Sequence, residues 1–198
     1  MPVSQESLEW DAQAATFDDE PDHGLLDADV RAAWGDLILP LLPRAPASVL
    51  DVGCGTGSLA VLLGQAGYDV HGIDFSERMI AAAAEKARAA EVAARFEVGD
   101  AQAPAVGPAS YDVVLGRHIL WALPDPSEAV RSWVALLRKP GVLVLVEGRW
   151  STGAGLTATA CENFVRPHRE ELSTTRLDDP ALWGRPISDE RYLLLSRR

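Results

Sequence analysis

A glycine-rich loop and a lone carboxylate stand where two short apolar segments of this 198-residue chain end. Residues 53–57 read Gly-Cys-Gly-Thr-Gly directly after Asp51 and Val52, and Asp74 closes the next apolar segment. Glycines allow a tight turn through which a ligand contacts the backbone, and a helix starting behind the turn offers unpaired N–H groups. A carboxylate after the following strand can accept hydrogen bonds from a ribose diol. The two features together predict a site for a nucleoside-containing ligand.

Two more polar segments follow later apolar runs. Residues 100–102 (Asp-Ala-Gln) come after the run 95–98, and residues 116–118 (Gly-Arg-His) come after the run 111–115. In a parallel sheet the carboxyl ends of the strands lie at one edge, which is where ligands bind. Four polar loops in this order therefore predict one shared site, although any one of them alone would be a weak signal.

The spacing of the glycines separates two classes of nucleoside ligand. Dinucleotide-binding loops read G-x-G-x-x-G and place a pyrophosphate at a helix N-terminus. Here the third glycine, Gly57, comes one place early, and Ser58 holds the dinucleotide position. Asp51 is poorly suited to face a pyrophosphate, whereas its carboxylate suits a cationic ligand such as an ammonium or a sulfonium.

Strand-like and helix-like segments alternate through most of the chain. Residues 48–52 form a β-branched run that ends at a glycine, as buried strands do, and residues 25–42 have apolar residues at helical spacing. Strands are expected at 48–52, 69–73, 95–98, 111–115, 142–147, 171–177 and 191–196, and helices at 25–42, 58–66, 76–90, 126–139 and 156–166. This alternation predicts a parallel sheet with helices on both faces.

The helix expected near residue 126 has the clearest boundary signals. Asp125 and Glu128 have the spacing of a capping box, and Pro126 stands at the first helical position. Arg138 and Lys139 are basic residues that favour a helix C-terminus, and a Pro-Gly pair then breaks the helix. We therefore expect this helix to continue to Lys139.

Composition narrows the classes of function. Hydrophobic residues make up 47% and charged residues 24% of the chain, as in globular domains. The net charge of −11 disfavours binding to nucleic acid or to an anionic membrane surface. No apolar run approaches the roughly 18 residues of a membrane span. The two cysteines have no metal-ligand spacing and fit a reducing, cytoplasmic compartment, and we expect no metal site.

Five segments in order resemble the motifs of class I S-adenosylmethionine-dependent methyltransferases, in their small-molecule branch. Residues 49–57 (VLDVGCGTG) are similar to the first motif of that family. Four further segments are similar to the later motifs of the family: residues 72–80 (GIDFSERMI), 99–102 (GDAQ), 111–126 (YDVVLGRHILWALPDP) and 136–147 (LLRKPGVLVLVE). Residues 10–18, with Trp10 and Phe17, resemble the N-terminal cap of that branch. The resemblance covers nearly the whole chain.

The resemblance implies a fold and a cofactor. The fold is an α/β fold with one Rossmann-like, doubly wound sheet of seven strands, mostly parallel, with an antiparallel last strand and an N-terminal helical cap. Residues 1–198 are expected to form one methyltransferase domain, with the cap and first helix in 1–45 and the cofactor-binding core in 46–198. The implied cofactor is S-adenosylmethionine, and its product is S-adenosylhomocysteine.

The resemblance also implies roles for individual residues. The glycines pass the methionine part of the cofactor, Asp74 holds the ribose hydroxyls, and the backbone near Arg117 faces the methionine amine. Asp100 accepts from the adenine amine or else caps a helix, while Phe75 and Met79 flank the adenine, with a pure core role as the alternative for Met79. The implied cofactor-binding set is Trp10, Phe17, Asp51, Gly53, Cys54, Gly55, Gly57, Asp74, Phe75, Met79, Asp100, Ala101, Gln102 and Arg117.

The chain departs from the family pattern at two informative places. Phe17 stands where a tyrosine is frequent, so a hydroxyl contact is lost there. The fourth motif lacks the Asn/Asp-Pro-Pro-aromatic sequence of many enzymes that methylate amino groups of nucleic acids, in agreement with the acidic net charge.

His118 and His23 are the candidate catalytic residues. His118 follows the fourth strand, beside the expected methyl group, and its imidazole is a base, a substrate-orienting group or a structural hydrogen-bonding group. His23 lies in a Pro-Asp-His-Gly turn, and its imidazole is likewise a base, a substrate-orienting group or a structural group. Glu147 ends the fifth strand and is expected to face substrate or to be structural. Trp121 and Trp150, near the same edge, are core or lid residues or stacking surfaces for an aromatic acceptor.

The sequence thus predicts an enzyme that transfers a methyl group from S-adenosylmethionine to a small organic acceptor by in-line displacement. The alternatives are a non-catalytic S-adenosylmethionine-binding module and a nicotinamide-dependent oxidoreductase. No nucleic-acid or membrane partner is expected. The acceptor, the atom that is methylated and the oligomeric state stay open.

Overall fold

The computed structural model describes residues 5–197 and confirms the alternation of strands and helices. The strands are β1 (Ser48–Val52), β2 (Asp69–Asp74), β3 (Arg95–Val98), β4 (Tyr111–Arg117), β5 (Leu137–Arg149), β6 (Leu172–Arg176) and β7 (Glu190–Ser196). The α-helices are α1 (Gln5–Gln13), α2 (Pro21–Gly24), α3 (Ala28–Ile38), α4 (Ser58–Gln65), α5 (Glu77–Ala89), α6 (Pro126–Leu136) and α7 (Ala158–Val165). Short 3-10 turns are η1 (Phe17–Asp19), η2 (Leu39–Leu41), η3 (Leu120–Ala122) and η4 (Pro180–Leu182).

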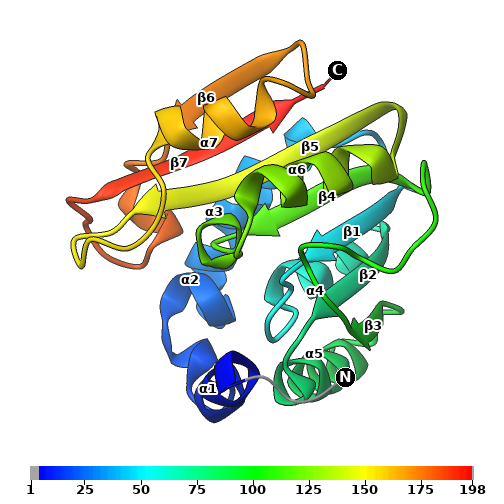
Figure 1. The fold of residues 1–198 in the computed structure, drawn as a ribbon. Helices are drawn as coiled ribbons and strands as arrows, with labels where there is room; N and C mark the ends of the chain where they lie inside the picture. Colours follow the sequence, from blue (N-terminus) through cyan, green and yellow to red (C-terminus); the bar gives the residue numbers. More distant parts are fainter. Residues whose placement is uncertain (1–4, 198) are drawn as a thin grey trace.

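The strands form one seven-stranded sheet in the order β3-β2-β1-β4-β5-β7-β6. Strands β1 to β5 are parallel, and β7 runs antiparallel to both β5 and β6, as the expected fold requires. The direction of winding reverses between β1 and β4, and the adjacent carboxyl ends of such strands leave room for a ligand. In Figure 1 the cap formed by α1 and α2 lies at the end of the sheet to which the arrows of β1 and β4 point.

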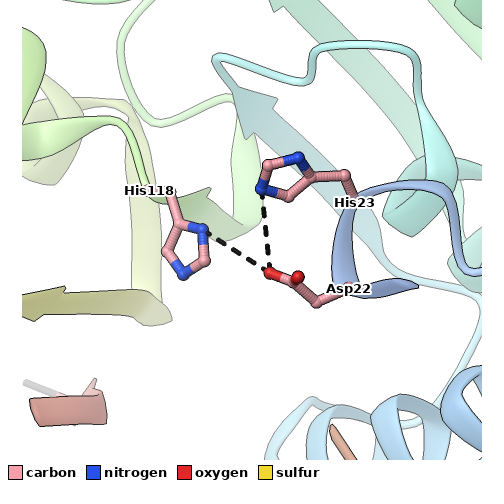
Figure 2. Close-up of side chains that lie close together, drawn as sticks. All are labelled: Asp22, His23 and His118. Carbon is pink, nitrogen blue, oxygen red and sulfur yellow. Dashed lines mark ion pairs between the residues drawn. The ribbon is translucent and has the colours of Figure 1, made fainter. Parts of the chain in front are cut away.

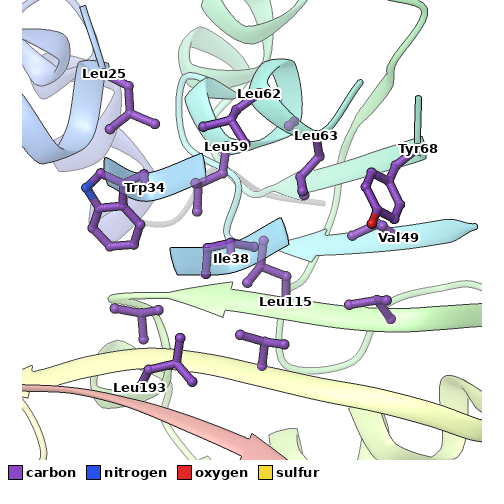
Figure 3. Close-up of a cluster of buried hydrophobic side chains, with 14 of the residues drawn as sticks. Leu25, Trp34, Ile38, Val49, Leu59, Leu62, Leu63, Tyr68, Leu115 and Leu193 are labelled. Atoms are coloured by element: carbon purple, nitrogen blue, oxygen red, sulfur yellow. The ribbon is translucent and has the colours of Figure 1, made fainter. Parts of the chain in front are cut away.

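Neighbouring residues of a strand enter different core layers, because side chains alternate across a sheet. Val49 packs with Trp34 and Ile38 of α3 in one layer (Figure 3), whereas Leu50 packs with Trp133 of α6 in the other. Strand β1 is thus buried on both of its faces, which accounts for its continuous apolar sequence. Within residues 5–197 no helix combines the length and the apolar character that crossing a membrane requires.

The helix expected to reach Lys139 ends at Leu136 instead, so that part of the prediction is wrong. Leu137 pairs with Tyr111 of β4 and begins β5. The side chain of Arg138 donates to a carboxylate oxygen of Asp112 at 3.0 Å rather than closing a helix. Pairing with a central strand outweighs a favourable charge at a helix end.

The capping box is only half formed. Oδ1 of Asp125 accepts from the backbone N–H of Glu128 at 3.0 Å, as predicted. The side chain of Glu128 pairs with Arg131 one turn later, and the N–H of Asp125 donates to Gln102. The N-terminus of α6 is therefore tied to the loop after β3, which a local motif does not reveal.

Strand β4 is longer than predicted, because residues 116 and 117 pair with residues 145 and 146 of β5. Arg117 is therefore the last residue of the strand, and His118 is the first residue beyond it. This placement brings the two side chains to the sheet edge beside the cap.

Replacement of Trp34 tests the packing beneath the cap. Its side chain is fully buried, lies edge-on to Trp183 with the ring centroids 5.6 Å apart, and donates from Nε1 to the carbonyl of Leu182 at 2.7 Å. Trp34→Phe should lower the free energy of unfolding by about 2–3 kcal/mol, because it removes buried volume and leaves a buried carbonyl without a donor. Urea denaturation measures the loss. Leu26→Ala, at a side chain that is 67% exposed, should change the free energy of unfolding by less than about 0.5 kcal/mol. Equal losses for Trp34→Phe and Leu26→Ala would contradict the role of Trp34 in the core.

Candidate functional site

A cavity of about 730 Å³ lies at the carboxyl ends of β1, β2 and β4, beneath the cap. Every residue of the predicted cofactor-binding set lines it except Gly57 and Gln102, and both His23 and His118 line it as well. The folded chain therefore brings the four predicted loops and the cap to one site. Gly57 instead precedes α4 and packs against Ala83 of α5.

The glycine loop is held against the neighbouring strand by its backbone. The N–H groups of Gly53 and Cys54 both donate to the carbonyl of Ile73, at 2.8 and 3.0 Å. Gly53 has φ +67°, and a Cβ there would lie 2.6 Å from the side chain of Ile119. Glycine is required at this position both by conformation and by space.

Asp74 connects the glycine loop with the next helix. One carboxylate oxygen accepts from the N–H of Gly55 at 3.0 Å, and the other accepts from the N–H of Ser76 at 2.9 Å. Burial raises the pKa of the Asp74 carboxyl, while these N–H groups oppose the shift. Each oxygen has two lone pairs, so the carboxylate retains capacity to accept from a hydroxyl group of a ribose.

Asp51 is a buried carboxyl group in the cavity wall. Burial raises the pKa of Asp51 to about 7, and the charge of Asp74 adds to the shift while Arg117 opposes it. A cationic ligand beside it would stabilise the charged carboxylate. This is the environment expected beside the ammonium group of an amino-acid moiety.

Arg117 ties the cap to the sheet. Its guanidinium donates to the backbone carbonyls of Asp22 and His23 in α2 and lies 5.1 Å from the centre of the Trp34 ring. Burial lowers the pKa of Arg117, and the carboxylates of Asp22 and Asp51 raise it. The last residue of β4 thus holds α2 over the cavity.

Aromatic rings of the cap cover the glycine loop. The ring of Phe17 packs closely against Gly55, because a Cβ added to Gly55 would lie 3.1 Å from that ring. His23 stacks on Phe17 with the ring centroids 4.4 Å apart, and Trp10 meets Phe17 edge-on at 6.2 Å. The phenylalanine that replaces the frequent tyrosine therefore serves as a packing surface between the cap and the loop.

Two acids of the cap, which the sequence did not single out as site residues, fasten it to the core. Asp18 accepts hydrogen bonds from Thr56 of the glycine loop and from Lys86 of α5. Asp11 accepts from the side chain of Ser76 and also lines the cavity. Each acid directly follows an aromatic residue of the cap, Trp10 or Phe17, and this repeated pair was the available signal.

His118 has a left-handed backbone conformation, with φ +56°. Its N–H donates to the carbonyl of Val146 at 2.8 Å, and its carbonyl accepts from Trp121 Nε1 at 3.0 Å. Nδ1 lies 3.9 Å from Oδ2 of Asp22, and Nε2 is buried with no hydrogen-bond partner in the part of the chain that the structure describes. Burial lowers the pKa of His118 well below that of a free imidazole.

Of the two alternatives for Glu147, the structure supports the structural one, because its side chain does not line the cavity. Its side chain is fully buried, and Oε1 accepts from the backbone N–H groups of Ile119 and Leu120 at 2.9 and 2.6 Å. Burial raises the pKa of Glu147 to about 8. Glu147 therefore holds the loop that follows His118, and Trp121 and Trp150 line the cavity beside that loop.

The loop after β3 contains no helix, so the alternative role of Asp100 as a helix cap is wrong. Oδ1 of Asp100 accepts from the N–H of Gln102 at 2.8 Å within a turn, and Asp100 lines the cavity. Met79 is almost fully buried and also lines the cavity, so its core position and its predicted place beside the adenine are compatible.

Comparison with known proteins matches residues 50–145 to a family described as a methyltransferase domain. A ubiquinone biosynthesis O-methyltransferase from Ralstonia nicotianae is 39% identical over 107 residues, which cover 54% of this chain and 44% of that protein. A 27-O-demethylrifamycin SV methyltransferase from Amycolatopsis mediterranei is 34% identical over 140 residues, covering 69% and 48%. The chain spans about half the length of the curated relatives it matches.

Solved structures share the fold at low sequence identity. The [4+2]-cyclase SpnF is similar with a TM-score of 0.74 and 19% identity, over 84% of this chain and 80% of that one. A phosphoethanolamine N-methyltransferase from Haemonchus contortus, solved with S-adenosyl-L-methionine, has a TM-score of 0.70 and 16% identity, over 84% and 52%. These likenesses confirm the doubly wound fold with the antiparallel β7.

The raised pKa of Glu147 predicts a dependence of stability on pH. Unfolded glutamate loses its proton near pH 4.5, whereas folded Glu147 keeps it until about pH 8. The contribution of this group to the free energy of unfolding therefore falls as pH rises through that window. Glu147→Gln keeps an oxygen for the two N–H donors but does not titrate.

The wild-type free energy of unfolding minus that of Glu147→Gln should accordingly fall from about pH 5 to about pH 8. Urea denaturation at each pH measures both values, and the subtraction removes the titration of the histidines. Glu85→Gln, at an exposed side chain of α5, should give a difference that does not change with pH. The same flat profile for Glu147→Gln would contradict the assignment.

Proposed function

Because this chain belongs to the class I S-adenosylmethionine-dependent methyltransferase family, we propose that it transfers a methyl group from S-adenosylmethionine to a small organic acceptor. The observation that carries the proposal is one cavity lined by the glycine loop, by the carboxylates of Asp51 and Asp74, and by the imidazoles of His23 and His118. This cavity would thus combine a nucleoside site with a second region that is lined by the aromatic rings of Trp121 and Trp150.

The residues present fit the cofactor. Asp74 would hold the ribose hydroxyls, Asp51 would face the ammonium group, and Asp100, Phe75 and Met79 would surround the adenine. When bound, the cofactor supplies a methyl group on a sulfonium. The bond from the methyl carbon to the acceptor forms as the carbon–sulfur bond breaks and its electron pair goes to sulfur.

The chain itself contributes positioning and the exclusion of water, which are the main requirements of such a displacement. The cap closes over the glycine loop through Phe17, and Arg117 holds α2 in place. His23 and His118, together with Trp121 and Trp150, would form the acceptor side of the cavity. The two histidines would orient the acceptor there.

A small acceptor is supported by the size of the cavity and by the matched relatives, which are named for ubiquinone biosynthesis and for a demethylrifamycin. The net charge of −11 supports the absence of a nucleic-acid partner. A cytoplasmic location is supported by two buried cysteines that are both unpaired.

Cofactor binding tests the nucleoside side of the site. S-adenosylhomocysteine should bind with a Kd of micromolar order, and NAD should not bind measurably by calorimetry. Asp74→Ala should weaken that binding about 10- to 100-fold, since it removes the acceptor of the ribose hydroxyls. Asp69→Ala, at the exposed start of the same strand, should leave it unchanged. Tight binding of NAD alone would refute the proposal.

Turnover with labelled S-adenosylmethionine and a panel of phenols, alcohols and amines tests the acceptor side and separates an enzyme from a binding module. With an accepted substrate, His23→Asn should lower kcat/KM about 100-fold, while the Kd for S-adenosylhomocysteine stays within about twofold. His168→Asn, at a histidine that does not line the cavity, is the matched control. A kcat/KM equal to wild type would remove His23 from the acceptor side.

A further inference from the structure

Two imidazoles and one carboxylate converge at the acceptor side of the cavity. Asp22 and His23 belong to α2, whereas His118 follows β4, and folding brings them together. Figure 2 shows both imidazoles directed at the same carboxylate oxygen. We propose that Asp22, His23 and His118 form a binding site for a divalent transition-metal ion.

The distances fit an ion between these groups better than direct hydrogen bonds. Oδ2 of Asp22 lies 3.7 Å from Nε2 of His23 and 3.9 Å from Nδ1 of His118, and both distances exceed the range of a hydrogen bond. One ligand atom from each residue lies within 4.8 Å of the other two. Ligand atoms at about 2.1 Å from one ion lie roughly 3.4 Å apart at the tetrahedral angle, so binding would draw these three atoms closer together.

The carboxylate of Asp22 is the strongest single observation. Its side chain is 9% exposed, and Oδ2 is buried with no hydrogen-bond partner among the described residues. A buried carboxylate oxygen without a partner is costly. An ion held by Asp22 and the two imidazoles would supply the missing partner.

The ligand types indicate the kind of metal. Two imidazole nitrogens and one carboxylate oxygen suit zinc, iron(II), cobalt(II) and nickel(II), and a set of three leaves further coordination positions open. Magnesium and calcium prefer sites built of oxygen atoms. The proposal is therefore limited to transition metals.

The backbone around the three residues is held in place before any ion binds. Arg117 donates to the carbonyls of Asp22 and His23. Gly24 is packed so closely that a Cβ there would lie 2.3 Å from the carbonyl oxygen of Asp18. His118 keeps its left-handed conformation, and such strained residues persist where the surrounding structure fixes them.

The local charges also admit a cation. Arg117 and Arg191 both act on the imidazole of His118. The carboxylates of Asp22 and Asp51 act on Arg117, and Asp189 pairs with Arg191 at 3.0 Å. Carboxylates therefore face both arginines beside the three proposed ligands.

The role of the ion would follow from its place in the acceptor region, and this part rests on the proposed function. A hydroxyl oxygen of the acceptor would take an open coordination position, and the ion would lower its pKa. The hydroxyl proton would pass to water. The oxygen lone pair would then form the bond to the methyl carbon, while the carbon–sulfur pair goes to sulfur.

Cobalt(II) added to the metal-free full chain tests the site without any methyl transfer. We expect one equivalent to bind, with visible absorption bands that report nitrogen and oxygen ligands. Asp22→Asn, His23→Asn and His118→Asn should each weaken binding by about 100-fold or more, because loss of groups that merely support ligands already costs 10- to 100-fold. Asparagine suits residue 118 because it tolerates a positive φ. Zinc should displace cobalt, and millimolar magnesium should not.

Matched controls make the outcomes distinct. Asp19→Asn, at an exposed acid of the cap, and His168→Asn should bind cobalt as the wild type does. Circular dichroism and the Kd for S-adenosylhomocysteine show whether each variant is folded. Absence of binding, or binding that survives all three substitutions as an adventitious ion only, would overturn the metal site. Retained binding of S-adenosylhomocysteine in that case would leave the proposed function standing.

Discussion

The burial of the Arg117 guanidinium is the constraint on which the rest of the site depends. A buried cation is costly unless carbonyls, carboxylates or aromatic rings surround it. Here the carbonyls of α2, the ring of Trp34 and the carboxylate of Asp51 do so. The groups that stabilise this one charge therefore come from the cap, from helix α3 and from the end of strand β1. The cavity exists because these parts meet there.

The loop that follows Arg117 shows the same dependence on buried polar groups. His118 adopts a positive φ, and the next two N–H groups donate to one oxygen of Glu147. The acid stabilises a backbone conformation that a histidine would rarely adopt alone. The position of the His118 imidazole is thus decided by β5 as much as by β4. Asp74 likewise stabilises the backbone of the glycine loop, because its carboxylate accepts from the N–H of Gly55.

The two sides of the cavity differ in how they are built. On the proposed nucleoside side, the glycine loop and the carboxylates of Asp51 and Asp74 line the cavity, and the glycines make room for the side chains of Ile119 and Phe17. On the acceptor side, side chains from separate elements meet, and rings such as His23, Trp121 and Trp150 form the wall.

The sequence by itself determined the order of the strands and main helices, the sheet, and the loops that meet at the cavity. Those depend on local signals: apolar runs that end in glycine, and carboxylates that follow strands. The end of α6, the burial of Glu147 and the acceptor of the Asp125 N–H, Gln102, were decided by partners distant in sequence. Asp22, His23 and His118 show the same limit most plainly. Helix α3 and all the elements from β1 to β4 separate Asp22 and His23 from His118. No spacing along the chain could therefore indicate that both imidazoles lie within 4 Å of one carboxylate oxygen. Only the tertiary structure decided that contact, because it depends on how α2 is held against the end of β4.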